Sequence, residues 1–282
     1  MNASVTAIVV TYNTDPQHLS AALDTLVSQC RVVVVDNSTQ PSARAAIRTT
    51  CAMRGADCLT LLGNFGIAHA QNRGICLARH HGATDILLMD DDSVPAATLV
   101  RDLLNARTRC TVQPVVISAR TIDAQGVDMS NRRPSLRNDL MPCSELTSSG
   151  TLIPMSAFDR VGNFDDALFI DCVDFEWGWR ALQAGVPLVV CDDVSIRHRL
   201  GEGSRLGLRI PSPIRHYYQY RNVSRMIVRS RAPLRWRLSQ SVKLPLKLLL
   251  IALLADCRIV RLRYAALGLV DSLLGRTGKF NH

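Results

Sequence analysis

Four continuous apolar runs, rich in β-branched residues, constrain the fold of this chain more than any other feature of its sequence. They cover residues 5–10, 32–35, 58–62 and 86–89, and each is followed by polar or Gly residues and then by a helix-like stretch. Strands that are buried on both faces read as continuous apolar runs, and strands that alternate with helices form parallel sheets. The sequence therefore predicts an α/β fold, a mainly parallel sheet flanked by helices.

The second half of the chain is less regular. It predicts strands over residues 114–120, 148–153 and 187–190 and a helix over 174–184. From residue 212 onward the pattern becomes helical and basic. We therefore expect an α/β core followed by a helical C-terminal region.

Charge is distributed unevenly along the 282 residues. From residue 195 to the end there are 18 Lys and Arg against 3 Asp and Glu, whereas the preceding part has 15 against 21. A basic region forms a surface for phosphates, whether of nucleic acid, anionic lipid or a pyrophosphate substrate. No nucleic-acid readout motif accompanies it, so we expect no nucleic-acid partner.

Composition and cysteine usage exclude several other classes. Hydrophobic residues make up 47% of the chain and charged residues 20%, which excludes a disordered chain and a polytopic membrane protein. The nine cysteines contain no C-x-x-C pair, so we expect reduced, mostly buried thiols. The first ten residues lack the pattern of a secretory signal, and we expect a cytoplasmic protein.

The sharpest local motif is the triplet Asp90, Asp91 and Asp92, which ends the fourth apolar run. Ligands of open α/β sheets bind beyond the carboxyl ends of the strands. Three adjacent carboxylates there repel one another unless a cation or strong donors neutralise them. Such hard oxygen ligands suit Mg²⁺ or Mn²⁺ carrying a diphosphate. The alternative is a solvated acidic loop.

Two other strand ends carry candidate ligand-binding residues. Asp36 follows four valines and could accept hydrogen bonds from a pyrimidine N3–H or a ribose hydroxyl, although a turn or capping role fits equally well. The segment 64–74 places small residues where the backbone approaches a ligand. Helix packing explains its glycines nearly as well.

A cluster of carboxylates and aromatic residues surrounds the start of the expected helix. Asp171, Asp174 and Glu176 accompany two tryptophans, of which Trp177 is the first. A carboxylate beside aromatic walls that stack on a sugar face can act as general base toward a hydroxyl. Helix capping and core packing are the alternative. His198 is an isolated histidine, for which a structural or solvated role is the ordinary interpretation.

Taken in order, these motifs resemble the family 2 inverting glycosyltransferases of GT-A fold, and among them the bacterial rhamnosyltransferase-like branch. The resemblance covers residues 5–198. It is carried by VTYN at 10–13, VDNS at 35–38, NxGxAxxxNxG at 64–74, DDDS at 90–93, SSGTLI at 148–153, FIDxVDxEW at 169–177 and His198.

The resemblance implies a GT-A catalytic domain over residues 1–205, with a nucleotide-binding half to about 110 and an acceptor half after it, and a basic helical region over 206–282. It implies that Asp174 is the catalytic base and that Asp92 and His198 bind the metal, Mg²⁺ or Mn²⁺. It further implies a nucleotide-sugar site and an acceptor or sugar pocket. The nucleotide-sugar residues would be Thr11, Asn13, Asp36, Asn64, Gly66, Asn72, Asp90 and Asp91, and those of the pocket Ser149, Gly150, Asp171, Glu176 and Trp177.

The function that the resemblance implies is transfer of L-rhamnose from dTDP-β-L-rhamnose to a polysaccharide or lipid-linked glycan, with inversion at the anomeric carbon. Asp91 stands where glutamine is common in this branch, and related galactofuranosyltransferases share the general pattern. UDP-galactofuranose or another nucleotide sugar is therefore the alternative donor. A non-catalytic protein that binds sugar nucleotides is the alternative outside the enzymes.

The C-terminal region combines its basic excess with an apolar run over residues 248–255. This run is too short to span a bilayer, which takes about 20 apolar residues. A helix that lies in the membrane interface, its leucines in the acyl boundary and its Lys and Arg on anionic head groups, fits the pattern. It would attach the enzyme peripherally to the inner face of the bacterial cytoplasmic membrane. The alternative is a helix that packs on the catalytic core.

Overall fold

β1 (Val5–Thr11) forms the centre of the parallel half of the sheet. It pairs in parallel with β2 (Arg31–Asp36) on one side and with β4 (Asp85–Asp90) on the other, and β3 (Asp57–Thr60) extends the sheet beyond β2. The computed structural model describes residues 4–122, 128, 140–198, 204–205, 208–209, 211–229 and 231–281. β2 and β3 lie on one side of β1, and the next strand in the chain, β4, lies on the other side. The carboxyl ends of β1, β2 and β4 therefore meet at the topological switch point of the sheet.

The other half of the sheet is mixed. β8 (Thr151–Pro154) runs antiparallel between β4 and β6 (Val116–Ile122), and β9 (Leu188–His198) runs parallel to β6. The short strands β5 (Ser93–Val94) and β7 (Leu140–Pro142) pair antiparallel with β9. The sheet order is β3-β2-β1-β4-β8-β6-β9-β5, which confirms the predicted α/β fold.

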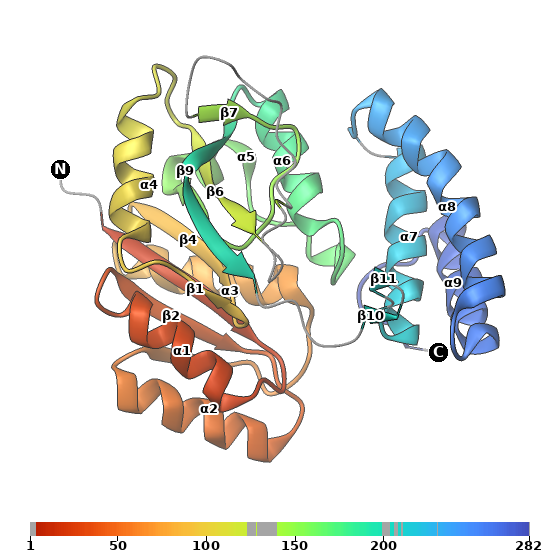
Figure 1. The fold of residues 1–282 in the computed structure, drawn as a ribbon, viewed down its shortest axis with the longest axis horizontal. Helices are drawn as coiled ribbons and strands as arrows, with labels where there is room; N and C mark the ends of the chain where they lie inside the picture. Colours follow the sequence, from red (N-terminus) through yellow and green to blue (C-terminus); the bar gives the residue numbers. More distant parts are fainter. Residues whose placement is uncertain are drawn as a thin grey trace.

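Helices cover both faces of this sheet (Figure 1). Side chains alternate along each strand, so Val32 and Val34 pack into one core cluster and Val33 and Val35 into the other. This two-sided burial explains the continuous apolar runs. The first cluster lies under α1 (Pro16–Leu26), α2 (Pro41–Arg54) and α4 (Leu99–Thr108), and the second under α3 (Ile67–His80), α5 (Met155–Val161) and α6 (Val173–Gln183).

Local sequence signals explain several element boundaries. α1 begins where the Asp15 carboxylate accepts a hydrogen bond from the Gln17 backbone N–H at 2.9 Å, with Pro16 in the first turn. The largest departure from the predicted boundaries is β9, which continues to His198, eight residues past the expected end. It does so because β6, β7 and β5 each supply it with a pairing partner.

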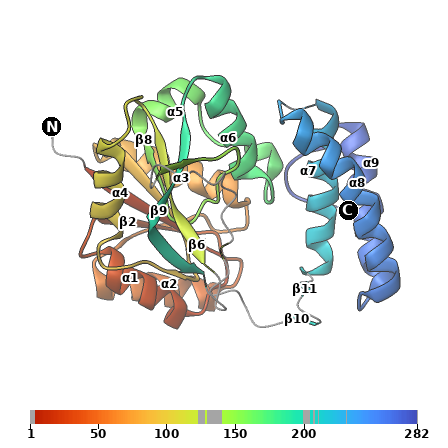
Figure 2. The ribbon, with the colours of Figure 1, turned by 45° about the horizontal axis from the view of Figure 1, so that its top comes forward.

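Within its described residues, the C-terminal region forms the helices α7 (Pro213–Arg229), α8 (Leu234–Leu254) and α9 (Arg258–Leu274), preceded by the antiparallel pair of β10 (Ser204–Arg205) and β11 (Leu208–Arg209). Figures 1 and 2 both show the helices as a group beside the α/β body. None of the helices within the described residues combines the length and apolar character that a membrane span requires.

Buried polar side chains of α7 attach this helical group to the α/β body. The Arg221 guanidinium donates to the Leu168 carbonyl at 2.9 Å, and the Asn222 side-chain amide donates to the carbonyls of Leu168 and Ile170 at 2.9 and 2.7 Å. Leu168 ends the 3-10 helix η1 (Asp166–Leu168). α7 therefore holds the loop that leads into α6.

Candidate active site

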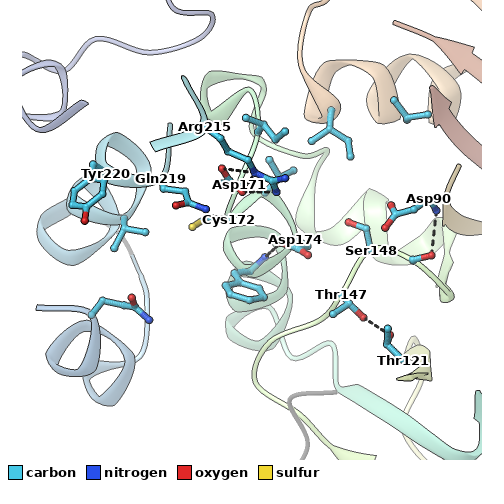
Figure 3. Close-up of a pocket in the computed structure, with 18 of the residues that line it drawn as sticks. Asp90, Thr121, Thr147, Ser148, Asp171, Cys172, Asp174, Arg215, Gln219 and Tyr220 are labelled. Carbon is cyan, nitrogen blue, oxygen red and sulfur yellow. Dashed lines mark hydrogen bonds and ion pairs between the residues drawn. The ribbon is translucent and has the colours of Figure 1, made fainter. Parts of the chain in front are cut away.

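A cavity of about 710 Å³ opens between the carboxyl end of β4 and the helices α7 and α8. Figure 3 shows labelled residues on both sides of it, Asp90, Thr121 and Ser148 from the α/β body and Gln219 and Tyr220 from α7. Its charged lining residues are Asp90, Asp91, Asp92, Asp171, Asp174, Arg215 and Lys247. The cavity is thus an acidic site faced by basic side chains of the C-terminal helices.

The acidic triplet is fixed by hydrogen bonds to its backbone and side chains. The Asp90 backbone N–H donates to Ser149 Oγ at 3.1 Å, and the Ser149 hydroxyl donates to Ser93 Oγ at 2.9 Å. The Asp91 carboxylate accepts from the Thr14 hydroxyl. Burial, followed by the charges of Asp92, Asp91 and Asp174, raises the pKa of Asp90 to about 7.

This donor set fits a divalent cation. Three half-buried carboxyl groups lie together at the edge of the cavity, and burial also raises the pKa of Asp91, so a positive charge there relieves repulsion and desolvation. No three His, Cys, Asp or Glu side chains within the described part of the chain are arranged to hold a metal by themselves. Mg²⁺ commonly takes one or two protein carboxylates and completes its shell with substrate phosphates and water.

The predicted metal ligand His198 lies at the end of β9, and its backbone pairs with Ser93, next in sequence to Asp92. The chain therefore brings these two predicted ligand positions to the same edge of the sheet. The His198 side chain lies outside the described part of the structure.

Asp174 lies in the first turn of α6, on the lining of the same cavity. Its Oδ1 accepts a hydrogen bond from the Phe175 backbone N–H at 3.0 Å. Burial raises the pKa of Asp174 to about 6, against the lowering effect of the backbone N–H groups of Phe175, Asp174 and Ser148. A carboxylate with this pKa is poised to accept a proton near neutral pH.

The loop before Asp174 has an unusual backbone. Phe169, Asp171 and Cys172 have φ values of 65°, 64° and 65°, in the left-handed region that non-Gly residues rarely adopt. Gly66, with φ of 90°, packs closely against this loop. A Cβ at this position would lie only 2.5 Å from the Phe169 carbonyl oxygen, so a larger residue would not fit. Strained backbone of this kind collects at functional sites.

Three predicted nucleotide residues gather at the ends of β1 and β2, beside the cavity but outside its lining. Asp36 Oδ1 accepts from the Thr11 hydroxyl at 3.4 Å and from the Ser38 backbone N–H at 3.0 Å, whereas Asp36 Oδ2 is buried without a hydrogen-bond partner among the described residues. The Asn13 side-chain carbonyl accepts from the backbone N–H groups of Thr39 and Gln40, both at 3.1 Å. Asp36 therefore keeps one buried acceptor atom that no described residue uses.

Of the predicted residues on the 64–74 segment, Asn64 lies near this edge and Asn72 does not. The Asn64 Oδ1 accepts from Asn37 Nδ2 at 3.1 Å and from the Gly66 backbone N–H at 3.0 Å. Asn72 instead exchanges two hydrogen bonds with the Phe164 backbone, at 2.9 and 3.0 Å. Both ends of the Asn72 amide therefore fix α3 to this loop, and its contact with the nucleotide stays a prediction.

Three of the predicted acceptor-pocket residues do not line the cavity. Trp177 is 1% exposed and lies in the core, with its Nε1 donating to the Gly162 carbonyl at 2.8 Å. Glu176 lies outside the cavity lining and pairs with the Arg180 guanidinium at 2.7 Å. Gly150 has φ of 74°, and a Cβ there would lie 2.9 Å from Ile196 Cδ1. Ser149 and Asp171 do line the cavity, whereas contacts of Trp177, Glu176 and Gly150 with the sugar stay predictions.

Sequence analysis missed the wall that the C-terminal helices contribute. Arg215, Gln219 and Tyr220 of α7 line the cavity, and α8 adds Trp236, Gln240, Leu244 and Lys247. The α8 residues follow the helical spacing of i, i+4, i+8 and i+11, which a sequence pattern can reveal. The sequence does not reveal that this face of α8 meets a sheet edge more than a hundred residues away in the chain.

The sequence profile of glycosyl transferase family 2 matches residues 6–160, more than half of the chain. The chain belongs to glycosyl transferase family 2.

Relatives along the whole chain agree with this assignment. The chain is 29% identical over 294 residues to the dTDP-rhamnosyl transferase RfbF of Shigella flexneri, covering 99% of this chain and 98% of that protein. The mannosyltransferase PcManGT of Pyrobaculum calidifontis, solved with GDP-Man and Mn²⁺, superposes with a TM-score of 0.60 at 16% identity, covering 97% of this chain and 76% of that one. TarS 1–349 of S. aureus, solved with UDP-GlcNAc, gives 0.58 at 15% identity, covering 97% and 92%. At these identities the two structures show a shared GT-A-like fold.

Proposed function

We propose that this enzyme transfers L-rhamnose from dTDP-β-L-rhamnose to a polysaccharide or lipid-linked glycan, with inversion at the anomeric carbon. The observation that carries the reaction is the cavity itself, in which the half-buried acidic triplet and the separately held Asp174 face one space. The near full-length relative named a dTDP-rhamnosyl transferase supports the choice of donor.

Asp174 acts as the general base in this proposal. It removes the proton from an acceptor hydroxyl, whose oxygen forms a bond to the anomeric carbon as the bond from that carbon to the diphosphate oxygen breaks. The departing group is the nucleoside diphosphate, the proton ends on Asp174, and a β-linked donor yields an α-linked rhamnoside. A pKa of about 6 leaves most of the Asp174 carboxylate ionised at pH 7.

Asp92 and His198 would hold Mg²⁺ or Mn²⁺ together with the diphosphate oxygens. When bound, the cation supplies neutralisation of the charge that develops on the leaving group. Asp90 and Asp91 would contact the ribose or phosphates at the same strand end. The buried position of Asp90 and its raised pKa support a cationic neighbour at this place.

The ends of β1 and β2 would hold the nucleoside. The buried, unpartnered Asp36 Oδ2 supports recognition of a pyrimidine N3–H, and the neighbouring Thr11 and Asn13 supply further polar groups. In this arrangement residues 1–205 form the catalytic domain, divided near residue 110 into a nucleotide half and an acceptor half. The basic helices of residues 206–282 close the acceptor side.

A donor panel tests this function. The enzyme is incubated separately with dTDP-rhamnose, UDP-galactofuranose, UDP-GlcNAc and GDP-mannose, with Mn²⁺ or Mg²⁺, and release of nucleoside diphosphate is measured with water as the acceptor of the sugar. We expect the highest kcat/KM with dTDP-rhamnose and its loss in excess chelator. A preference for UDP-galactofuranose would replace the proposed donor, and metal-dependent binding without turnover of any donor would point to a non-catalytic protein.

A further inference from the structure

The far end of the helical hairpin formed by α8 and α9 exposes an apolar surface. Its members, between 40% and 79% exposed, lie in the last turns of α8 and the first turn of α9, namely Leu249, Leu250, Leu253, Leu254, Ile259 and Val260. We call these six residues the hairpin surface. Large apolar side chains that gather on an exposed surface mark an interaction site.

Basic side chains accompany the hairpin surface. Lys243, Arg258 and Arg263 are exposed on the same two helices. The sequence from Leu234 to Leu274 contains two acidic residues, Asp256 and Asp271. Asp256 accepts from the Arg261 guanidinium at 2.8 Å, and Asp271 is buried with the Tyr217 hydroxyl at 2.8 Å. The surface therefore presents leucines within a field of positive charge.

α8 also carries a second face that lines the cavity. Trp236, Gln240, Leu244 and Lys247 point to the cavity, whereas the neighbouring face of the same helix exposes Leu238, Val242 and Leu246, which continue toward the hairpin surface. One helix thus separates the acidic site from an apolar and basic exterior.

We infer that the hairpin surface docks on an anionic lipid bilayer, with its leucines in the acyl boundary and Lys243, Arg258 and Arg263 on the head groups. Apolar burial combined with Lys and Arg on anionic head groups is what holds an interfacial helix. This docking brings the α8 wall of the cavity to the membrane. Docking would also bring the cavity to an acceptor held in the membrane. This part of the inference rests on the proposed transfer to a lipid-linked glycan.

Charge favours the bilayer over a second copy of this chain. A symmetric dimer through the hairpin surface would bring Lys243, Arg258 and Arg263 of each copy toward those of the other, and like charges at an interface cost affinity. An anionic membrane instead attracts each of these side chains.

Vesicle flotation of the full chain, without donor or acceptor, tests the docking. We expect flotation with vesicles that contain phosphatidylglycerol at low salt, less at high salt, and little with phosphatidylcholine alone. The variant Leu253→Gln, Leu254→Gln, Ile259→Gln should lower the bound fraction by roughly tenfold or more. Replacing Lys243, Arg258 and Arg263 by Gln should lower the fraction bound to anionic vesicles and leave the fraction bound to phosphatidylcholine vesicles unchanged.

The matched control is Met53→Gln with Val112→Gln, two apolar residues of the α/β body that are 76% and 51% exposed. It should float like the parent. Release of nucleoside diphosphate in solution should be unchanged in all variants, which shows that they fold and separates this test from that of the proposed function. Absence of flotation on anionic vesicles at low salt, or equal flotation of the leucine variant, overturns the inference. A dimer in solution that the leucine variant converts to monomer, without flotation, assigns the surface to a second copy.

Discussion

The Arg215 guanidinium holds the Asp171 carboxylate through Nη2 at 2.9 Å and Nε at 3.1 Å, both to Oδ1. This pair joins the first turn of α7 to the loop that precedes α6, across the cavity wall (Figure 3). Asp171 is 13% exposed as a side chain, and its charge is one of the causes that raise the pKa of Asp174. The C-terminal helices therefore take part in the electrostatics of the proposed base.

The rate of transfer should rise with pH through about 6 and then reach a plateau. A general base must be ionised to accept a proton, and burial raises the pKa of Asp174 to about 6. One unit below this value roughly a tenth of the enzyme is active. The measurement is kcat/KM against pH between 5 and 8, and a constant kcat/KM over this range would contradict the assignment.

Arg215→Ala should move this pH midpoint upward. Without the guanidinium, the negative charge of Asp171 acts uncompensated on Asp174 and disfavours its ionised form. Adding Asp171→Asn to the Arg215→Ala background should return the midpoint toward that of the parent, and Arg215→Lys, which keeps the charge, should shift it less. Equal midpoints in all four proteins would show that the ion pair is structural alone.

Asp174→Asn should lower turnover by roughly 10²–10⁴ while leaving donor affinity nearly unchanged, because the amide is almost isosteric but cannot take the proton. The matched control is Glu176→Gln on the same helix, since Glu176 lies outside the cavity lining and pairs with Arg180. Turnover and binding of the donor are measured separately, by steady-state kinetics and calorimetry. Near-normal turnover of Asp174→Asn would transfer the role to Asp171.

Divalent cations should stabilise the enzyme as well as activate it. Mn²⁺ or Mg²⁺ with a nucleoside diphosphate relieves repulsion within the triplet, so the Tm should rise and chelation should reverse the rise. Asp92→Asn should reduce this shift, whereas Asp159→Asn on the surface of α5 serves as the control. Differential scanning fluorimetry measures the shift, and the proposed ligand would be wrong if Asp92→Asn responded like the parent.

Trp177 and Trp236 should respond differently to truncation. Trp177→Ala removes a core side chain that packs against Phe158 and Phe164, so the free energy of unfolding should fall by about 3–5 kcal/mol. Trp236 lines the cavity. Trp236→Ala should therefore raise the acceptor KM, and it should lower the free energy of unfolding less than Trp177→Ala does. Denaturant unfolding and kinetics on both variants check this contrast, and an acceptor KM that changes in Trp177→Ala alone would contradict it.

The parallel strands and their polar ends could be predicted because their signals are local. Val32 to Val35 read as a strand buried on both faces, and the carboxylates that follow such strands must meet at one edge of the sheet. Which face of α6 turns toward the core and which toward the cavity could not be predicted in this way. Phe158 and Phe164 draw Trp177 into the core, and these contacts arise from a different helix and loop.

The contribution of α7 and α8 was beyond local sequence patterns for a further reason. Arg215 meets Asp171 at a separation of 44 residues, and Lys247 faces the triplet from more than 150 residues away. Their basic character predicted a surface for phosphates, and the structure adds that part of it faces the cavity.

The cavity wall from α7 and α8 is encoded in one contiguous stretch near the end of the chain, whereas the strand-end carboxylates come from its first two-thirds. Mutations that reshape this wall therefore leave the residues at the sheet edge untouched. A lineage can vary one side of the pocket by exchanging a single gene segment, and a protein engineer can graft the same segment between homologues as a cassette. The two walls are separate in sequence but bonded in space, so such a segment must keep Arg215 and Asn222, whose side chains donate to Asp171 and Leu168 of the α/β body.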